Sequence, residues 1–597
     1  MKRIHAMPYG AQLEADGRVR FRLWAPAARR VTLCLEEPAA VLPLEAHADG
    51  WHELLTDAAG PGRRYRYRIN DGPQVPDPAA RFQPEGVHGP SEVIDPRAFP
   101  WQDAGWRNRP WQETVLYELH VGSFTPQGGY AGVTERLDHL AALGVTALEL
   151  MPLAAFPGSH GWGYDGVLPY APHAAYGRPE ELKALVQAAH QRGLMVFRDV
   201  VYNHFGPEGN YLHLYAPAFF SNRHHTPWGA ALNFDGAHSG PVREFFIHNA
   251  LYWLEEYHLD GLRLDAVHAI ADDSQPDILE ELAARVQARF GHERRVHLVL
   301  ENDHNAAHYL ERGYRAQWND DLHHALHVLL SGETAGYYAD YADAPARHLG
   351  RCLAEGFAYQ GEPSPYRGGH RRGEPSGHLP PDAFVGFLQN HDQIGNRARG
   401  ERITRLAEPE AVRAATALLL FAPAIPLLFM GEEWGCRQPF PYFCDFGPEL
   451  AAQVAAGRRR EFAARHDLGD APLPDPGTAG TFARARLDWS AAASPAGRHW
   501  QAQVQELLTL RRHWLVPRLA GAGGGRYRLL GPRAVQVDWR LGDGSDLHLL
   551  ANLGPEPVQG VAQPPGRLLY AGGSEAAAAL AGGTLPPWSV LWLGEEP

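Results

Sequence analysis

The strongest constraint in this sequence of 597 residues is an alternation, from residue 114 onward, of short apolar runs with helical patterns. Eight runs have the length and composition of buried strands. They are TVLYELHVG (114–122), VTALELMPL (145–153), LMVFRDVVYNH (194–204), GLRLDAVH (261–268), VHLVLEND (296–303), AQWND (316–320), DAFVGFLQNHDQ (382–393) and IPLLFMGEE (425–433). Strands that alternate with helices indicate βα units and a parallel sheet, and eight such units predict a (β/α)8 barrel.

Helical patterns separate the predicted strands. In PEELKALVQAAHQRG (179–193) apolar residues recur at helical spacing, Pro179 stands where a first turn tolerates proline, and Gly193 stands where a helix ends. VREFFIHNALYWLEEYHLDG (242–261) is also predicted as a helix, and QAQVQELLTLRRHW (501–514) is predicted as the eighth helix of the barrel.

The ends of the chain have the period of strands instead. Residues 1–95 contain VRFRLWAP, RVTLCLE and RYRYRIN between turn residues, which predicts an N-terminal immunoglobulin-like β-sandwich. Residues 96–110 form a Pro/Trp-rich linker, and residues 111–516 form the barrel with its loop insertions. Residues 517–597 return to short alternating strands and predict a C-terminal β-sandwich. The expected class is therefore α/β, a TIM barrel flanked by two β-sandwiches.

Two insertions are long enough to shape the barrel mouth. Residues 205–240 follow the third predicted strand, and residues 361–381 are rich in Gly, Pro and Arg. We predict that 361–381 is a loop over the mouth, with a flexible linker as the alternative.

Composition excludes several classes of function. The net charge is −14 without a long run of one sign, which argues against a nucleic-acid partner. No apolar run reaches the roughly 18 residues of a membrane span, and the first residues lack the apolar core of a secretory signal. The four cysteines form no C-x-x-C pair, so neither a zinc site nor a disulfide framework is expected. We predict a soluble, cytoplasmic protein.

Polar side chains stand at the C-terminal ends of several predicted strands, which is where a barrel builds its active site. They are Asp199 and His204 after the third strand, Arg263, Asp265 and His268 after the fourth, Glu301 after the fifth, and Asn390, His391 and Asp392 after the seventh. Helix capping accounts for one such aspartate. It does not account for four carboxylates accompanied by His and Arg.

The sequence surroundings of Asp265 and Glu301 differ, and the difference favours an ionised carboxylate at one and a protonated carboxyl at the other. Arg263 and Asp265 are two residues apart on a strand and point the same way, so the guanidinium keeps the carboxylate ionised, as a nucleophile requires. Glu301 follows the apolar run VHLVL, which raises the pKa of a carboxyl group and suits a proton donor. Retaining glycosidases use such a pair, about 5–5.5 Å apart.

Other residues are candidates for binding a sugar. Asp392 and His391 would hold ring hydroxyls, and the GWGYDG run (161–166) offers Trp162, Tyr164 and Asp165. An aromatic side chain in that run would lie under a sugar ring. For Trp162, plain packing is the alternative interpretation.

The runs DVVYNH, GLRLDAVH, LEND and FLQNHD together resemble the conserved regions of the α-amylase superfamily, in order and on the expected strands. The resemblance implies Asp265 as nucleophile, Glu301 as general acid/base and Asp392 as third carboxylate. It also implies substrate binding by Asp199, His204, Arg263, His268 and His391, with Asn390 beside them.

MPLAAFPG, YAPHAAYG, HTPWGAALNFDG and LLFMGEEWG are similar to segments of the trehalose-releasing hydrolases of that superfamily. This implies cleavage of an α-1,4-glucosidic bond next to a terminal trehalose, on malto-oligosaccharides that end in trehalose and on related α-glucans. No cofactor and no metal are expected, and the enzyme would act after a trehalose-forming synthase. Asn302 and His224 depart from the expected Ser and Tyr, and Asn203 matches a calcium-binding position of some relatives without a partner cluster.

Two other functions stay open at this point. A glucan branching enzyme would use the same carboxylates but transfer the glucan instead of hydrolysing it. A glycan-binding scaffold on an inactive barrel is disfavoured, because Asp265, Glu301 and Asp392 are all present.

Overall fold

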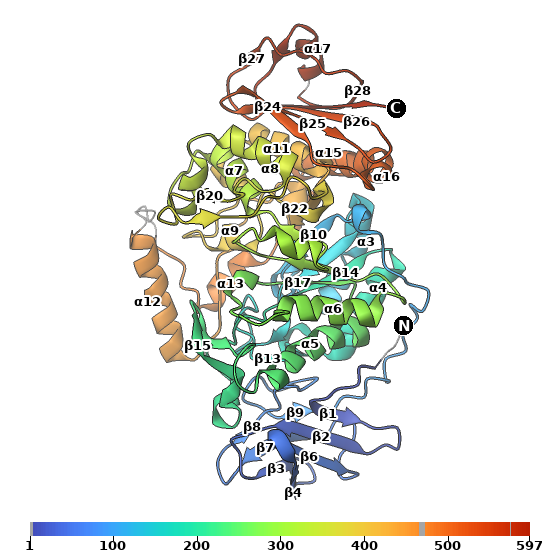
Figure 1. The fold of residues 1–597 in the computed structure, drawn as a ribbon, viewed down its shortest axis with the longest axis vertical. Helices are drawn as coiled ribbons and strands as arrows, with labels where there is room; N and C mark the ends of the chain where they lie inside the picture. Colours follow the sequence, from blue (N-terminus) through green and yellow to red (C-terminus); the bar gives the residue numbers. More distant parts are fainter. Residues whose placement is uncertain (1–3, 465–471, 574, 597) are drawn as a thin grey trace.

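The structure is a computed structural model that describes residues 4–464, 472–573 and 575–596. Three parts follow one another along its long axis, namely two small N-terminal sheets, a central barrel and a C-terminal sheet (Figure 1). Within the described residues, no helix combines the length and the apolar character needed to cross a membrane.

The central part is a closed barrel whose eight parallel strands lie in sequence order. These strands are β10 (Leu116–Leu119), β11 (Ala147–Leu150), β14 (Met195–Val200), β17 (Gly261–Leu264), β18 (His297–Leu300), β19 (Ala316–Trp318), β22 (Phe384–Gly386) and β23 (Ile425–Phe429). Each lies within one of the predicted apolar runs, so the predicted (β/α)8 barrel is confirmed. Each strand is shorter than its run, because the last residues of the run leave the sheet and form the barrel mouth.

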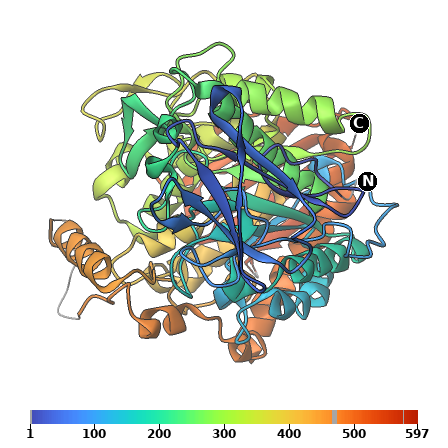
Figure 2. The same ribbon diagram turned by 90° about the horizontal axis from the view of Figure 1, so that it is seen from below.

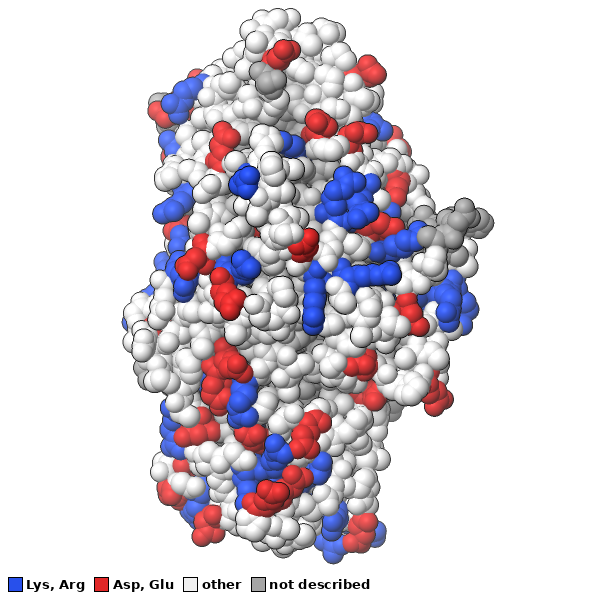
Figure 3. All heavy atoms as spheres, turned by 180° about the vertical axis from the view of Figure 1, so that it is seen from behind, with Lys and Arg blue, Asp and Glu red and all other residues white. Residues whose placement is uncertain are grey.

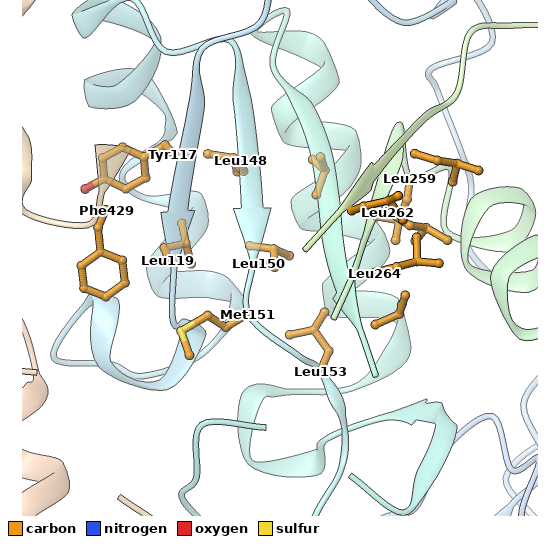
Figure 4. Packing of buried hydrophobic residues seen from close by; sticks show 14 of the residues in the cluster. Tyr117, Leu119, Leu148, Leu150, Met151, Leu153, Leu259, Leu262, Leu264 and Phe429 are labelled. Atoms are coloured by element: carbon orange, nitrogen blue, oxygen red, sulfur yellow. The ribbon is translucent and has the colours of Figure 1, made fainter. Parts of the chain in front are cut away.

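Side chains alternate across the barrel wall, as the pleat of a strand requires. An inner cluster that includes Leu116, Phe197 and Val299 fills the barrel. The intervening residues belong to a separate outer cluster shared with the surrounding helices, shown in Figure 4 for Tyr117, Leu119, Leu148, Leu150, Leu262 and Leu264. Four of the polar residues predicted for the site have the parity of the inner cluster, namely Asp199, Arg263, Asp265 and Glu301.

Helices surround the barrel, and the three predicted ones are present. The helix predicted at 242–261 spans Ser239–Glu256, and the one predicted at 501–514 begins earlier, at Pro495. α4 (Pro179–Gln191) begins at the predicted proline. The other long helices are α5 (Ser239–Glu256), α6 (Ile278–Phe290), α7 (Asp320–Ser331), α8 (Pro345–Glu355), α11 (Pro409–Phe421) and α15 (Pro495–Leu510). α12 (Pro448–Ala464) projects from the side of the barrel (Figure 2).

The N-terminal part consists of two antiparallel sheets. One contains β1 (Gly10–Leu13), β2 (Val19–Trp24), β6 (Trp51–Thr56) and β5 (Glu45–Ala46), and the other contains β4 (Ala40–Pro43), β3 (Val31–Leu35), β7 (Arg64–Ile69), β8 (Gln74–Val75) and β9 (Ser91–Glu92). After these strands, Arg81 forms a buried ion pair with Glu256 of α5, with Nε 3.1 Å from Oε1. The pair fastens this part to the barrel.

The predicted linker packs on the barrel through a buried network of charged groups. The His190 ring lies between Asp103 of the linker and Asp260, which precedes β17, at 2.9 Å from each carboxylate. The Trp106 ring stacks on His190, and the Trp101 ring stacks on His258. These contacts explain why aromatic residues recur in this segment.

The C-terminal part is a five-stranded antiparallel sheet with strand order β24-β25-β26-β30-β28. The strands are β24 (Arg526–Gly531), β25 (Ala534–Arg540), β26 (Asp546–Asn552), β28 (Arg567–Gly572) and β30 (Ser589–Glu595). One face packs on the barrel helices, where the Trp592 indole donates to the carbonyl of Ala417 in α11. A small second layer covers the other face, formed by α17 (Ala576–Ala581) with β27 (Val558–Gln559) and β29 (Thr584–Leu585).

Two segments lie around the barrel mouth. The 205–240 insertion contains a hairpin of β15 (Phe220–Thr226) and β16 (Gly229–Leu232), and the 361–381 segment contains the short strands β20 (Glu362–Pro363) and β21 (Arg371–Arg372).

On the rear face, acidic and basic side chains are mixed over most of the surface, although several basic side chains lie together across its middle (Figure 3).

Candidate active site

A cavity of about 620 Å³ lies at the C-terminal ends of the barrel strands. Asp265, Glu301 and Asp392 all line it. So do five of the predicted sugar-binding residues, namely Trp162, Tyr164, Asp165, His204 and His268. The remaining four, Asp199, Arg263, Asn390 and His391, are buried beside the cavity, within hydrogen-bonding networks that hold its wall.

The buried guanidinium of Arg263 organises the two central acids. Its Nη1 donates to Asp265 Oδ1 at 2.6 Å and to Asp199 Oδ2 at 2.7 Å, and its Nη2 lies 3.5 Å from Glu301 Oε2. The cation also lies over the Trp318 ring, 4.3 Å from its centroid. One planar group therefore brings the Asp265 and Glu301 carboxyls to the same side of one cavity.

Asp265 is held from two directions. While Arg263 binds one of its oxygens, the side-chain amide of Asn203 donates to the other at 3.1 Å. Hydrogen bonds to an ionised carboxylate stabilise the charged form and fix its orientation. Asn203, which the sequence relates to a calcium-binding position, thus has a structural role at Asp265.

Glu301 has the environment expected of a proton donor. Burial raises the pKa of its carboxyl well above the ordinary value, Arg263 opposes this shift, and the Asp265 charge adds to it. The backbone N–H of Ala266 donates to Oε2 at 2.5 Å, and Arg263 approaches the same oxygen. Both contacts fall on one oxygen, so Oε1 is left to carry the proton.

Ala266 reaches this position through a left-handed backbone conformation with φ 41°. Such a conformation is unfavourable for a residue with a side chain and persists where surrounding contacts impose it, often at functional sites. Here it turns the chain directly after Asp265 and aims the N–H at Glu301.

Two predicted sugar contacts have another role in the structure. The Asn390 side chain caps the short helix α9 (His391–Gly395) by accepting from the backbone N–H groups of Asp392 and Gln393. Trp162 is only 3% exposed, and its ring stacks on Phe440. Packing, the alternative considered for Trp162, therefore describes most of its surface.

Several residues that line the cavity were not predicted from the sequence. Trp228 of the 205–240 insertion is 51% exposed and stacks on His204, and Tyr366 of the 361–381 segment is 55% exposed. Asp320 also lines the cavity, and burial raises the pKa of its carboxyl to about 7. Asp320 ends the predicted sixth strand, so the rule that found the other acids could have found it.

The two departures from the expected sequence pattern lie outside the catalytic centre. His224 of β15 contacts Asp235 at 2.9 Å and lies 3.8 Å from Asp273, a group with the spacing of metal ligands among the described residues. Arg223 already neutralises both carboxylates, at 3.3 and 3.0 Å. Asn302 supports the local turn, since its side chain accepts from the backbone of His304.

Comparison with known families divides the chain into three regions. Residues 8–84 match carbohydrate-binding module 48, the isoamylase N-terminal domain, and residues 93–218 match the alpha amylase catalytic domain. Residues 522–592 match a domain of unknown function, DUF3459. These regions follow the same order as the three parts of the structure.

Individual relatives extend the match along the chain. The malto-oligosyltrehalose trehalohydrolase of Arthrobacter ramosus is 45% identical, over 83% of this chain and 87% of that protein. The enzyme of the same name from Saccharolobus solfataricus is 43% identical, over 81% of this chain and 84% of that protein. A branching enzyme from Rubrobacter xylanophilus is 34% identical but matches only 44% of this chain and 40% of its own length.

Solved structures agree with this relationship. A Salmonella typhimurium protein described as an alpha amylase superimposes with a TM-score of 0.94 at 44% identity, covering 99% of this chain and 100% of that chain. A pullulanase from Paenibacillus barengoltzii shares the fold, with a TM-score of 0.73 at 22% identity over 100% of this chain and 95% of that chain. From its sequence relatives, its barrel and the match to the alpha amylase catalytic domain, this chain belongs to the malto-oligosyltrehalose trehalohydrolase family of glycoside hydrolases.

Proposed function

We propose that this enzyme hydrolyses the α-1,4-glucosidic bond next to the terminal trehalose of malto-oligosyltrehalose, with retention of configuration, and releases trehalose and a malto-oligosaccharide. The observation that carries this proposal is the contact of one guanidinium, Arg263, with both Asp265 and Glu301 at the wall of one cavity. An ionised carboxylate beside a protonated one is the arrangement that double displacement at an anomeric carbon requires.

In the first step, Glu301 Oε1 would give its proton to the glycosidic oxygen while Asp265 attacks the anomeric carbon from the opposite face. The C–O bond to trehalose breaks, and a glucosyl ester forms on Asp265. Arg263 and Asn203 fix the attacking carboxylate, so little reorganisation is needed as its charge disappears.

In the second step, the Glu301 carboxylate would take a proton from a water molecule. The water oxygen attacks the anomeric carbon and the bond to Asp265 breaks, which restores both carboxyl groups. Asp392, at the cavity wall, would hold ring hydroxyls of the reacting glucose. Tyr164 and His204 lie in the same wall and would contact that sugar.

The substrate and its place in a reaction sequence follow from the relatives named above and remain part of the proposal. The substrate would come from a synthase that converts the reducing end of a malto-oligosaccharide into trehalose. The four cysteines Cys34, Cys352, Cys436 and Cys444 are free and buried, which suits the reducing cytoplasm that we propose as the compartment.

Product analysis on maltotriosyl-trehalose tests this function. We expect trehalose and maltotriose as the only products, and no release by Asp265→Asn, which cannot form the ester. Incubation with amylose separates the alternative, because a branching enzyme would create α-1,6 linkages and release no trehalose. New branches without trehalose, or near-normal turnover by Asp265→Asn, would refute the proposal.

A further inference from the structure

We propose that Glu118, a buried carboxylate of the first barrel strand, is a positioning residue for the reaction, because it holds the His391 ring against Asp392 in its cationic form. The inference rests on the proposed function of the same site. Nothing in the sequence singles out Glu118, which is the acidic residue within the apolar run TVLYELHVG.

The contact between Glu118 and His391 uses both oxygens of the carboxylate. Glu118 Oε1 makes a short contact with His391 Nδ1, and Oε2 accepts from the His391 backbone N–H at 3.3 Å. Glu118 is 1% exposed and His391 is 0% exposed, so water does not weaken the pair. The carboxylate therefore fixes the imidazole ring together with the first residue of α9.

The other edge of the ring faces the cavity wall. His391 Nε2 lies 3.5 Å from Asp392 Oδ1, and Nε2 has no hydrogen-bond partner among the residues that the structure describes. The Tyr164 ring stacks on the imidazole with 5.0 Å between centroids, and the Trp162 ring meets it edge-on at 5.3 Å. Each ring nitrogen thus faces a carboxylate, and the aromatic rings prevent the imidazole from turning away.

The surroundings of the ring favour the imidazolium form. Burial alone lowers the pKa of His391, but the Asp392 and Glu118 charges outweigh it and raise the value to about 9. Arg263 opposes the shift. An imidazolium has a proton on Nε2 to offer to Asp392 or to a sugar hydroxyl, whereas a neutral ring protonated at Nδ1 would turn a lone pair toward the Asp392 carboxylate.

The remaining groups that face His391 contribute less charge at neutral pH. Burial lowers the pKa of His120 to about 4, so this ring is neutral at pH 7. Burial raises the pKa of Glu149 well above its ordinary range, which favours the protonated form of that carboxyl. Burial raises the pKa of Asp199 to about 6, and that carboxylate is bonded to Arg263. Glu118 and Asp392 are therefore the two charges that hold His391 as a cation.

Glu149 of the neighbouring strand β11 gives a matched control. It is equally buried in the barrel interior and has the same parity as Glu118, yet within the described part of the chain neither of its carboxyl oxygens has a hydrogen-bond partner. A glutamine has the shape of a protonated glutamate. Glu149→Gln should therefore leave the charge on His391 unchanged.

The experiment compares pH profiles of kcat/KM for an aryl α-maltooligoside, whose leaving group needs no proton. It is done in the Glu301→Gln background, where titration of the proton donor is removed. We expect Glu118→Gln to move the basic limb to lower pH by about one to three units, the usual effect of one adjacent opposite charge. Glu149→Gln should not move it. Superimposed profiles, or equal shifts in both variants, would overturn the inference.

Glu118→Asp provides a second test that does not depend on the folding of Glu118→Gln. It keeps the charge but withdraws the carboxylate from His391 Nδ1, so kcat should fall about tenfold, as expected for the loss of one hydrogen bond between charged groups. The basic limb should move less than in Glu118→Gln, because the charge of the carboxylate is kept. An unchanged kcat would contradict the positioning role. Trehalose release by the unaltered enzyme is measured separately, so failure of this inference and failure of the proposed function are distinguishable.

Discussion

Replacing Arg263 with lysine tests whether one guanidinium orders both acids of the site. Arg263 Nη1 makes two short charge-assisted bonds, to Asp265 and to Asp199, and Nη2 approaches Glu301. A lysine ammonium is a single compact donor on a flexible chain and cannot span these groups. We expect it to keep one of the two short bonds and lose the other.

The magnitude follows from the lost bond. A hydrogen bond to a charged group contributes about 1.5–3 kcal/mol, and each 1.4 kcal/mol changes a rate about tenfold. Loss of the bond that fixes Asp265, the proposed nucleophile, should therefore lower kcat/KM for maltotriosyl-trehalose by about ten- to two-hundredfold.

Arg198→Lys is the matched control for this substitution. Arg198, in β14, is buried like Arg263. Its guanidinium lies on the outer side of the barrel, however, with its carbon 3.7 Å from the centroid of the Trp253 ring. Steady-state kinetics and urea unfolding of both variants separate an effect on the site from a general loss of stability. Near-normal kcat/KM for Arg263→Lys, or an equal loss in Arg198→Lys, would refute the role assigned to the guanidinium.

Three further outcomes follow from the structure. Glu301→Gln should slow hydrolysis of the natural substrate far more than that of an aryl glycoside, because only the former leaving group needs a proton, and equal losses would argue against Glu301 as the acid. Asp103 and Asp260 raise the pKa of His190 against the effect of burial, so its stabilising contribution is complete below the unfolded pKa of about 6.5 and is lost as pH rises through the folded pKa. Urea unfolding of His190→Gln should lack the decline in unfolding free energy above pH 6.5 that the parent and His297→Gln retain, and parallel curves would contradict this. Trp228→Ala should raise KM about two- to tenfold by removing an aromatic face from the cavity, and an unchanged KM would show that the side chain does not touch substrate.

The barrel and its central acids could be predicted because their signals are local. An apolar run that ends in a polar residue marks both a buried strand and its C-terminal end, and in a closed barrel these ends meet at one mouth. The different environments predicted for Asp265 and Glu301 also come from near neighbours in the chain, Arg263 and the run VHLVL, while the roles of the two acids in the reaction are proposals.

The rest depends on contacts between residues that are far apart in the sequence. Glu118 and His391 are separated by 273 positions, and nothing near Glu118 indicates its partner. Trp228 and Tyr366 line the cavity from two insertions. The sequences of these insertions have no helical or strand period from which their course could be predicted. The role of Asn203 had no local signal either, because its amide holds the carboxylate of Asp265, which lies 62 positions away.

The buried pair between Arg81 and Glu256 limits how this protein can be engineered. Separating two such partners leaves an uncompensated charge inside the protein, at a cost of about 3–5 kcal/mol. The two N-terminal sheets therefore cannot simply be exchanged for those of another carbohydrate-binding module. A chimera must carry Arg81 across the junction, because an apolar residue at Glu256 would also remove the carboxylate that lies 3.8 Å from the buried ammonium of Lys183.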